Sequence, residues 1–442
     1  MTFNRLLRAP IPRRFRGRAS RLRRVEALPH TQLPMTIDAP DLASLLDDAR
    51  AILPDTIELR RRIHRRPEIG LELPATQALV VEELRRLGLE PVLGGSLSSV
   101  SATIDGGKPG PTILLRGDMD ALPLHEDTGL EFSSEIDGVM HACGHDTHVA
   151  MLLGAARLLV DRRAELPGRV LLMFQPGEEG FGGALSMIDE GLLDVPTDGP
   201  HGPVTGAFAI HIGTTYPTGT IRLRPGAQMA SSDVLRIEVT GRGGHASAPH
   251  RALDPITVAA EIIIGLQTVV TRQIDAFDPA VVTIAKVIAG TTNNIIPETA
   301  SLLGTIRTVS EETRAQAGAL VRQVAEGIAA AHGASAKVDI EAGYPVTVND
   351  PAYAAFVLDV AAELAGADVV EPLRDPIMGA EDFSYVLQRV PGVMAFLGAR
   401  PDGLDPATAP ENHSNLVVFD EPAMALGVAL YTAVALRHLE RE

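Results

Sequence analysis

TILLRGDMDALP (residues 112–123), HACGHDTHVAMLLGAARLLV (141–160) and VLLMFQPGEEG (170–180) together decide the fold of this chain. The first and third begin with short apolar runs that suit strands buried on both faces, and the middle one has the length and period of a helix. Strand-helix-strand units of this kind form parallel sheets covered by helices. We therefore predict an α/β fold with a mostly parallel sheet and helices on both faces.

Polar side chains follow each predicted strand. Asp118 and Asp120 follow the first strand, Glu178 and Glu179 follow the second, and His211 follows a further apolar run at 207–210. Ligands of open α/β sheets bind at the carboxyl ends of the strands. We therefore expect these three groups of side chains to meet in one cleft.

Cys143 is the only cysteine of the 442 residues, and it stands between Ala142 and Gly144 in the HACGHD motif. A lone cysteine is most often a small buried hydrophobe, but here the neighbouring histidines favour a metal ligand. Its place before a predicted helix N-terminus also favours a thiolate. Taken singly, His211 would be a core histidine and His413 a surface one. Five donors together suit a shell for two divalent ions: Cys143, His145, Glu179, His211 and His413.

The sequence pattern changes near residue 232. Strand-like runs at 234–239, 281–287, 300–307 and 337–341 alternate with helical runs at 255–274 and 311–331. Their order, β-α-β-β-α-β, is typical of the ferredoxin-like arrangement. We predict a leader at 1–35, a main domain in two parts at 36–230 and 344–442, and an inserted domain at 231–343. In the main domain a first helix is expected over 41–65, with a break at Pro54.

Composition and charge exclude several classes of protein. The net charge is −17 although residues 1–34 hold nine arginines and one glutamate, so the remainder is strongly acidic and we expect no nucleic-acid partner. The basic leader lacks the apolar stretch of a signal peptide, and we expect it to be disordered. No uninterrupted apolar run is long enough to span a membrane. A single cysteine needs no oxidising compartment, so we predict a cytoplasmic location.

Taken together, the motifs resemble the aminoacylase and carboxypeptidase metallohydrolase family, a metallopeptidase family, in its hippurate hydrolase and auxin-conjugate (indole-acetyl amino acid) amidohydrolase branch. The resemblance runs from about Asp55 to the C-terminus. Its motifs, in the family's order, are RRIHRRPE (61–68), RGDMDALP (116–123), HACGHD (141–146), QPGEEG (175–180), GGHASAPH (243–250), NIIPE (294–298), GAEDF (379–383) and NHSN (412–415).

The resemblance implies a zinc-peptidase-like catalytic domain that holds two divalent metal ions per subunit, zinc or manganese, with cobalt and nickel as further candidates. Cys143 would bridge the ions, and the remaining ligands would be His145, Glu179, His211 and His413. A water between the ions would attack the substrate's carbonyl, with Glu178 as general base and then as general acid. Asp118 and Asp120 would orient the ligands without binding metal.

The resemblance also assigns roles within the inserted domain, which would serve as a lid and a dimerisation domain. His245 would stabilise the oxyanion across a homodimer, although a solvent-facing turn histidine is the alternative. Asn294 and Arg307 would hold the substrate's carboxylate, although an arginine on a strand is often only solvated.

Phe181, in the main domain, is expected to narrow the acyl pocket.

The activity implied is metal-dependent hydrolysis of the amide bond of an N-acyl amino acid or a related small conjugate. A dipeptidase or carboxypeptidase of the same mechanism is the nearest alternative. A non-catalytic binding protein for acyl conjugates would be expected to lose ligands or Glu178, and neither loss is present. A redox thiol enzyme would need a resolving thiol, and the chain has no second cysteine.

Overall fold

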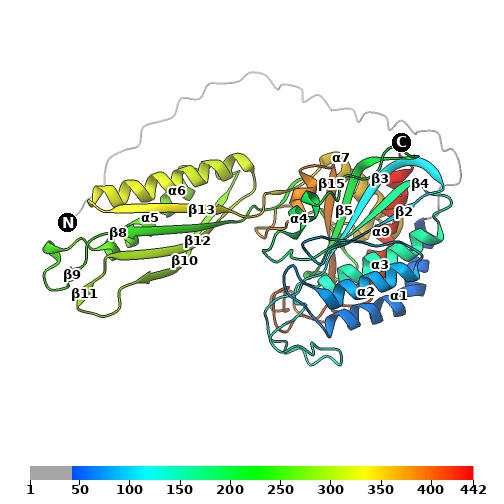
Figure 1. Ribbon diagram of the computed structural model, residues 1–442, viewed down its shortest axis with the longest axis horizontal. Helices are drawn as coiled ribbons and strands as arrows, with labels where there is room; N and C mark the ends of the chain where they lie inside the picture. Colours follow the sequence, from blue (N-terminus) through cyan, green and yellow to red (C-terminus); the bar gives the residue numbers. More distant parts are fainter. Residues whose placement is uncertain (1–41, 442) are drawn as a thin grey trace, which may run out of the picture. The chain divides into compact units, whose positions relative to one another are not determined.

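The computed structural model describes residues 42–441, so the predicted leader lies outside the described residues. Its largest sheet has seven strands in the order β1-β2-β4-β3-β5-β15-β6 (Figure 1). The four central strands are parallel: β4 (Pro167–Gln175), β3 (Lys108–Asp118), β5 (His201–Pro217) and β15 (Gly392–Arg400). The edges are antiparallel: β1 (Val92–Leu93), β2 (Val100–Asp105) and β6 (Ile221–Arg222). The predicted parallel sheet is confirmed for its centre.

The apolar runs of the central strands are buried on both faces. Ile113 and Leu115 belong to one hydrophobic cluster, whereas Leu114 between them belongs to another, because successive side chains of a strand point to opposite faces. The helices of the first cluster are α1 (Leu42–His64), α2 (Pro74–Arg86), α3 (His145–Asp161), α7 (Pro351–Ala365) and α9 (Ala423–Leu439). The second cluster contains residues of α4 (Gly183–Asp189) and α8 (Ser384–Leu387). Helices therefore cover both faces, as predicted.

The break predicted at Pro54 is wrong, because α1 continues through this residue without interruption. Pro54 lies on the exposed side of the helix, and so does Arg50, whose carbonyl loses its usual partner. Water can hydrate that carbonyl, which lowers the cost of the missing hydrogen bond.

The inserted segment has a sheet and a hydrophobic cluster of its own. Its sheet has the order β10-β12-β8-β13 and is antiparallel throughout. The elements are β8 (Asp233–Thr240), α5 (Pro255–Arg272), β10 (Ala280–Ala289), β12 (Thr299–Thr308), α6 (Glu311–Ala331) and β13 (Ser335–Ala342). This order is the predicted ferredoxin-like one. The proposed boundaries at 231 and 343 stay predictions.

Shorter elements complete the described chain. Two small sheets pair β9 (Gly244–His245) with β11 (Ile295–Ile296) and β7 (Gly226–Met229) with β14 (Thr347–Asn349). The 3-10 helices are η1 (Pro249–Arg251) and η2 (Ala367–Val369). Within residues 42–441, α5 is long and apolar enough to cross a membrane by length and composition. A third of this helix is buried, and five of its buried side chains belong to the hydrophobic cluster on the four-stranded sheet: Val258, Ala259, Ile262, Leu266 and Val269.

Candidate metal centre

The loop before α3 brings Cys143 and His145 to the carboxyl end of β3. Gly144 between them is the N-cap of α3 and has a φ of 86°, in the left-handed region that glycine adopts without strain. A Cβ at Gly144 would lie 2.5 Å from Cγ2 of Ile212. Both the backbone turn and the close approach of β5 therefore require glycine here.

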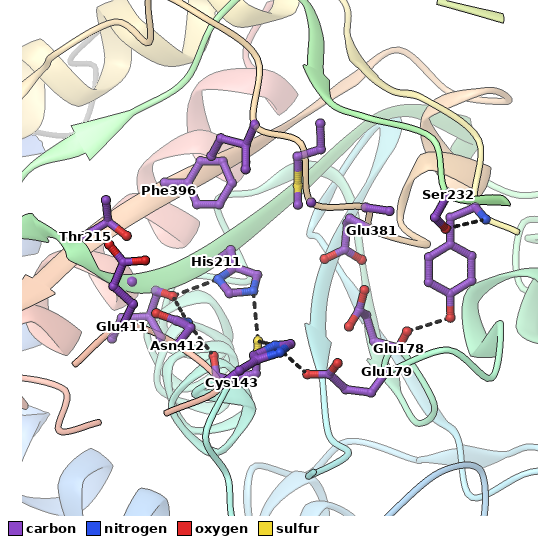
Figure 2. A pocket seen from close by; sticks show the side chains of 18 of the residues that line it. Cys143, Glu178, Glu179, His211, Thr215, Ser232, Glu381, Phe396, Glu411 and Asn412 are labelled. Carbon is purple, nitrogen blue, oxygen red and sulfur yellow. Dashed lines mark hydrogen bonds and ion pairs between the residues drawn. The ribbon is translucent and has the colours of Figure 1, made fainter. Parts of the chain in front are cut away.

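The five predicted ligands lie together. Cys143 Sγ is 3.4 Å from His211 Nε2 and 3.3 Å from His413 Nε2 (Figure 2). Glu179 Oε1 is 3.3 Å from His413 Nε2 and 4.0 Å from His145 Nε2. The ligands form two sets that share Cys143, and within each set the ligand atoms lie within 4.8 Å of one another. One set is Cys143, His145 and His211, and the other is Cys143, Glu179 and His413.

These residues fit two metal ions that share Cys143. Thiolate, imidazole and carboxylate are the donors of zinc and related divalent ions. Both ring nitrogens of His145 are buried and make no hydrogen bond with the described residues, although Nε2 lies 3.4 Å from Asp118 Oδ2 and 4.0 Å from Glu179 Oε1, and Nδ1 lies 3.5 Å from Asp120 Oδ1. Buried ring nitrogens without a hydrogen bond are costly unless a ligand such as a metal ion engages one of them.

Hydrogen bonds to Ile212 fix the tautomers of two histidines. His211 Nδ1 is 2.7 Å from the Ile212 carbonyl oxygen, so it carries the proton and leaves Nε2 free towards Cys143. Burial lowers the pKa of His211 to about 3, which keeps the ring neutral. His148 Nε2 accepts from the Ile212 backbone N–H, so its Nδ1 donates to Asp118 Oδ1 at 2.5 Å. His148 therefore orients Asp118, which supports the predicted orienting role of that carboxylate.

His413 is held in a conformation that residues other than glycine rarely adopt, with a φ of 70°. Its backbone N–H donates to the Ala142 carbonyl, and the Asn412 side chain donates to the carbonyls of Cys143 and Ile212. These bonds join the His413 loop to the Cys143 loop and to β5. A role for Asn412 was not predicted, although its place in the NHSN motif was a signal.

The predicted thiolate at Cys143 is not supported by its surroundings alone. Burial and the nearby charge of Glu179 raise the pKa of Cys143, and together they outweigh the favourable effect of His145. Only a bound cation would reverse this balance, because metal coordination deprotonates a thiol.

Two adjacent glutamates leave the end of β4 in different directions. The backbone N–H groups of Glu178 and Glu179 donate to the Asp120 carboxylate at 2.9 and 3.0 Å. The Glu179 side chain then faces His413, whereas the carboxylates of Glu178 and Glu381 face one another (Figure 2). Burial and the charges of Glu381 and Glu179 raise the pKa of Glu178 well above its ordinary value, which favours proton uptake by this carboxylate.

A buried arginine pairs with carboxylates of this acidic group, a role that was not predicted from the sequence. Arg116 is fully buried in β3, with NH1 2.6 Å from Asp118 Oδ2 and NH2 2.7 Å from Glu381 Oε1. Asp382 accepts two hydrogen bonds from the side-chain amide of Gln175. Two signals for Arg116 were present in the sequence: a charged residue at the end of an apolar run, and its place at the start of the RGDMDALP motif.

A cavity of 690 Å³ opens beside the ligands. Apolar side chains make up much of its wall, among them Ile212, Phe396 and Met229, and Arg307 of β12 also lines it. Phe181 is not among the lining residues. Its ring lies against Gly70, 3.3 Å from where a Cβ would stand, and its predicted effect on the acyl pocket stays a prediction.

His245 lies on β9, and Asn294 directly precedes β11, the strand that pairs with β9. Neither residue lines this cavity. His245 is exposed, and its Nδ1 accepts from the Ser247 backbone N–H and contacts the Ser247 hydroxyl. The Asn294 carbonyl accepts from the Ala246 N–H. The two residues are thus neighbours, which leaves their predicted roles open.

Comparison with known proteins identifies the family. The sequence pattern of Peptidase family M20/M25/M40 matches residues 114–437, which hold all five predicted ligands. The chain belongs to this family. The M20 chain described here is therefore a metal-dependent hydrolase of amide bonds, and the family resemblance predicted from the motifs is confirmed.

Individual relatives of this M20 chain include hydrolases with different substrates. Thermostable carboxypeptidase 2 of Saccharolobus solfataricus is 41% identical over 397 residues, covering 89% of this chain and 98% of the relative. IAA-amino acid hydrolase ILR1-like 4 of Arabidopsis thaliana is 35% identical, covering 87% and 85%. The crystal structure of the Bacillus subtilis YXEP protein, described as a dinuclear metal-binding peptidase from the M20 family, matches with a TM-score of 0.76 and 34% identity, covering 89% and 100%. The likeness supports two metal ions in this chain.

Proposed function

We propose that this protein hydrolyses the amide bond of N-acyl amino acids or related small conjugates and releases the amino acid and a carboxylic acid. The observation that carries the proposal is one cavity lined by four of the five proposed ligands, Cys143, Glu179, His211 and His413, together with Glu178 and Arg307. The hydrolase of indole-acetyl amino acids among the relatives supports this substrate class.

In the proposed mechanism two divalent ions would be held by Cys143, which belongs to both ligand sets, and by His145, Glu179, His211 and His413. The ions would polarise the substrate's carbonyl and lower the pKa of the attacking water. Glu178 takes the proton of that water and later gives it to the departing amine. Its burial beside Glu381 suits proton uptake, because burial and the neighbouring charge raise the pKa of Glu178 above its ordinary value. We propose zinc or manganese as the ions, with cobalt and nickel as alternatives.

The carboxylate of the substrate would be held by Arg307, whose planar fork binds carboxylates with two hydrogen bonds. His245 and Asn294 would act from the partner subunit of a homodimer, with His245 on the oxyanion. The exposure of His245 agrees with a role that requires a second subunit. We also propose that the chain divides at 231 and 343 into a catalytic domain and an inserted lid. The proposed location of the protein is the cytoplasm.

The test is hydrolysis of hippurate, N-acetyl amino acids, an indole-acetyl amino acid and a dipeptide by protein stripped of metal and reloaded with Mn²⁺ or Zn²⁺. Activity should appear only with metal and disappear in Glu178→Gln, which keeps the size of the side chain. Glu326→Gln, an exposed exchange on α6, is the matched control. Metal-dependent cleavage that survives Glu178→Gln would remove Glu178 from the mechanism.

A second candidate is a carboxypeptidase or dipeptidase of the same mechanism. The 41% identity to a carboxypeptidase favours it. The same panel separates the two, because a preference for the dipeptide over every N-acyl amino acid would replace the proposed substrate class and leave the roles of the residues unchanged.

A further inference from the structure

Tyr344 stands where the chain leaves β13 and enters the second part of the main domain. Its backbone is tied to Ser232, which precedes β8. The Ser232 N–H donates to the Tyr344 carbonyl at 2.9 Å, and the Tyr344 N–H donates to Ser232 Oγ at 3.2 Å. The chain enters the inserted segment near Ser232 and leaves it near Tyr344, and these two connections are hydrogen-bonded to each other.

The hydroxyl of Tyr344 makes three hydrogen bonds, all to the loop that carries the two active-site glutamates. It donates to the Glu178 carbonyl at 2.6 Å and accepts from the N–H groups of Gly180 and Gly182 at 2.9 and 3.1 Å. One donor and two acceptors are the full capacity of a phenol. Burial and the charges of Asp382 and Glu178 raise the pKa of Tyr344, so the hydroxyl stays protonated and able to donate.

The loop has backbone hydrogen bonds of its own, from Gly180 N–H to the Glu178 carbonyl at 2.6 Å and from Gly183 N–H to the Gly177 carbonyl at 3.1 Å, and Tyr344 adds bonds from outside the loop. Gly180 and Gly182 have φ values of 94° and 69°, and no other atom lies within 4 Å of the place where either Cβ would stand. Glycines in open space give the backbone many alternative conformations. Asp120 holds the N–H groups of Glu178 and Glu179, and Tyr344 holds the carbonyl side of Glu178.

From this geometry we propose that Tyr344 is a positioning residue: its hydroxyl sets the orientation of the Glu178–Glu179 loop and does so from the junction with the inserted segment. Without the hydroxyl, the N–H of Gly182 loses its acceptor and the loop gains freedom, so Glu178 leaves its place beside the substrate. The inference rests on the proposed function of Glu178, and its test includes a measurement that needs neither substrate nor metal.

Tyr344→Phe removes the hydroxyl and keeps the ring, which packs edge-on against Tyr385 with centroids 6.2 Å apart. Tyr385→Phe is the matched control, because among residues 42–441 its hydroxyl hydrogen-bonds the Gly343 carbonyl, at 3.5 Å, and no residue of the loop. In metal-loaded protein we expect kcat of Tyr344→Phe to fall by about 10- to 100-fold with little change in KM, since small displacements of catalytic groups have effects of this size. Tyr385→Phe should retain the wild-type kcat.

Hydrogen exchange of peptides covering Gly180 and Gly182, measured on metal-free protein, gives the second measurement. These amides should exchange faster in Tyr344→Phe than in the wild type and in Tyr385→Phe. Equal exchange in all three proteins would overturn the proposal, and so would an unchanged kcat in Tyr344→Phe. An inactive wild type with faster exchange in Tyr344→Phe would refute the proposed function alone and leave the fastening of the loop established.

Discussion

Asp120→Asn should weaken the centre although Asp120 is not one of the proposed ligands. The Asp120 carboxylate is fully buried and accepts the consecutive N–H groups of Glu178 and Glu179 at 2.9 and 3.0 Å. Asparagine keeps one oxygen acceptor but turns an amide N–H₂ towards the second backbone N–H. One of the two adjacent glutamates therefore loses the bond that fixes its backbone.

The size of the effect follows from the bonds lost. A hydrogen bond to a charged group contributes about 1.5–3 kcal/mol. Loss of one such bond, about 2 kcal/mol, corresponds to a decrease of about 30-fold if it appears entirely in transition-state stabilisation. Changes in residues that orient metal ligands commonly lower metal affinity or activity by about 10- to 100-fold, which is the same range.

The assay compares kcat/KM at saturating metal and the metal affinity obtained by competition with a chelating dye. Glu190→Gln is the matched control, because Glu190 also accepts two consecutive N–H groups, those of Gly95 and Ser96, but is exposed and does not line the cavity. The control should match the wild type in both measurements. If Asp120→Asn keeps both kcat/KM and metal affinity within about threefold of the wild type, the fastening of the glutamates by Asp120 is refuted.

Three further changes test other parts of the structure. Arg60→Met should lower the free energy of unfolding by about 3–5 kcal/mol in urea titrations, because Asp146, paired with Arg60 at 2.7 Å, would keep a buried charge with one partner fewer. Burial lowers the pKa of His438 from 6.5 to about 4, so the unfolded chain binds more protons and stability falls between pH 6.5 and pH 4. His438→Gln should reduce that loss by about 3 kcal/mol in denaturation curves at the two pH values. Arg307→Gln should raise KM about 10-fold or more for substrates with a free carboxylate, with little effect on their amide analogues in steady-state kinetics.

The sequence predicted those residues of the metal centre whose positions follow from their place at the end of a strand or the start of a helix. Cys143, His145 and Glu179 each stand next to a strand end or a helix start, and these positions meet in any parallel sheet of this connectivity. His211 was placed after an apolar run, whereas β5 continues to Pro217. The prediction still located it, because the pairing of β5 with β3 ends at Ala209 and His211 lies beyond that point.

Contacts between distant segments could not be predicted in the same way. Arg116 pairs with Glu381, and the Tyr344 hydroxyl meets the Glu178 loop, across more than 160 residues in each case. Hydrophobic period and motif spacing carry no information about which polar side chains will meet after folding. The error at Pro54 has a related cause, because the cost of a proline inside a helix depends on whether its face is exposed.

The Glu178–Glu179 pair illustrates what tertiary structure adds to a motif. In the sequence the two residues are both glutamates and cannot be told apart. Their assignment as base and ligand came from the resemblance to the metallohydrolase family. In the folded chain burial raises the pKa of both, but hydrogen bonding to His413 and the charge of His145 lower the pKa of Glu179 overall, while Glu381 raises that of Glu178 further. Neighbouring carboxylates whose pKa values are driven apart in this way are suited to different tasks. The carboxylate kept ionised suits a cation, and the carboxylate that holds a proton more readily suits proton transfer, which supports Glu179 as ligand and Glu178 as base.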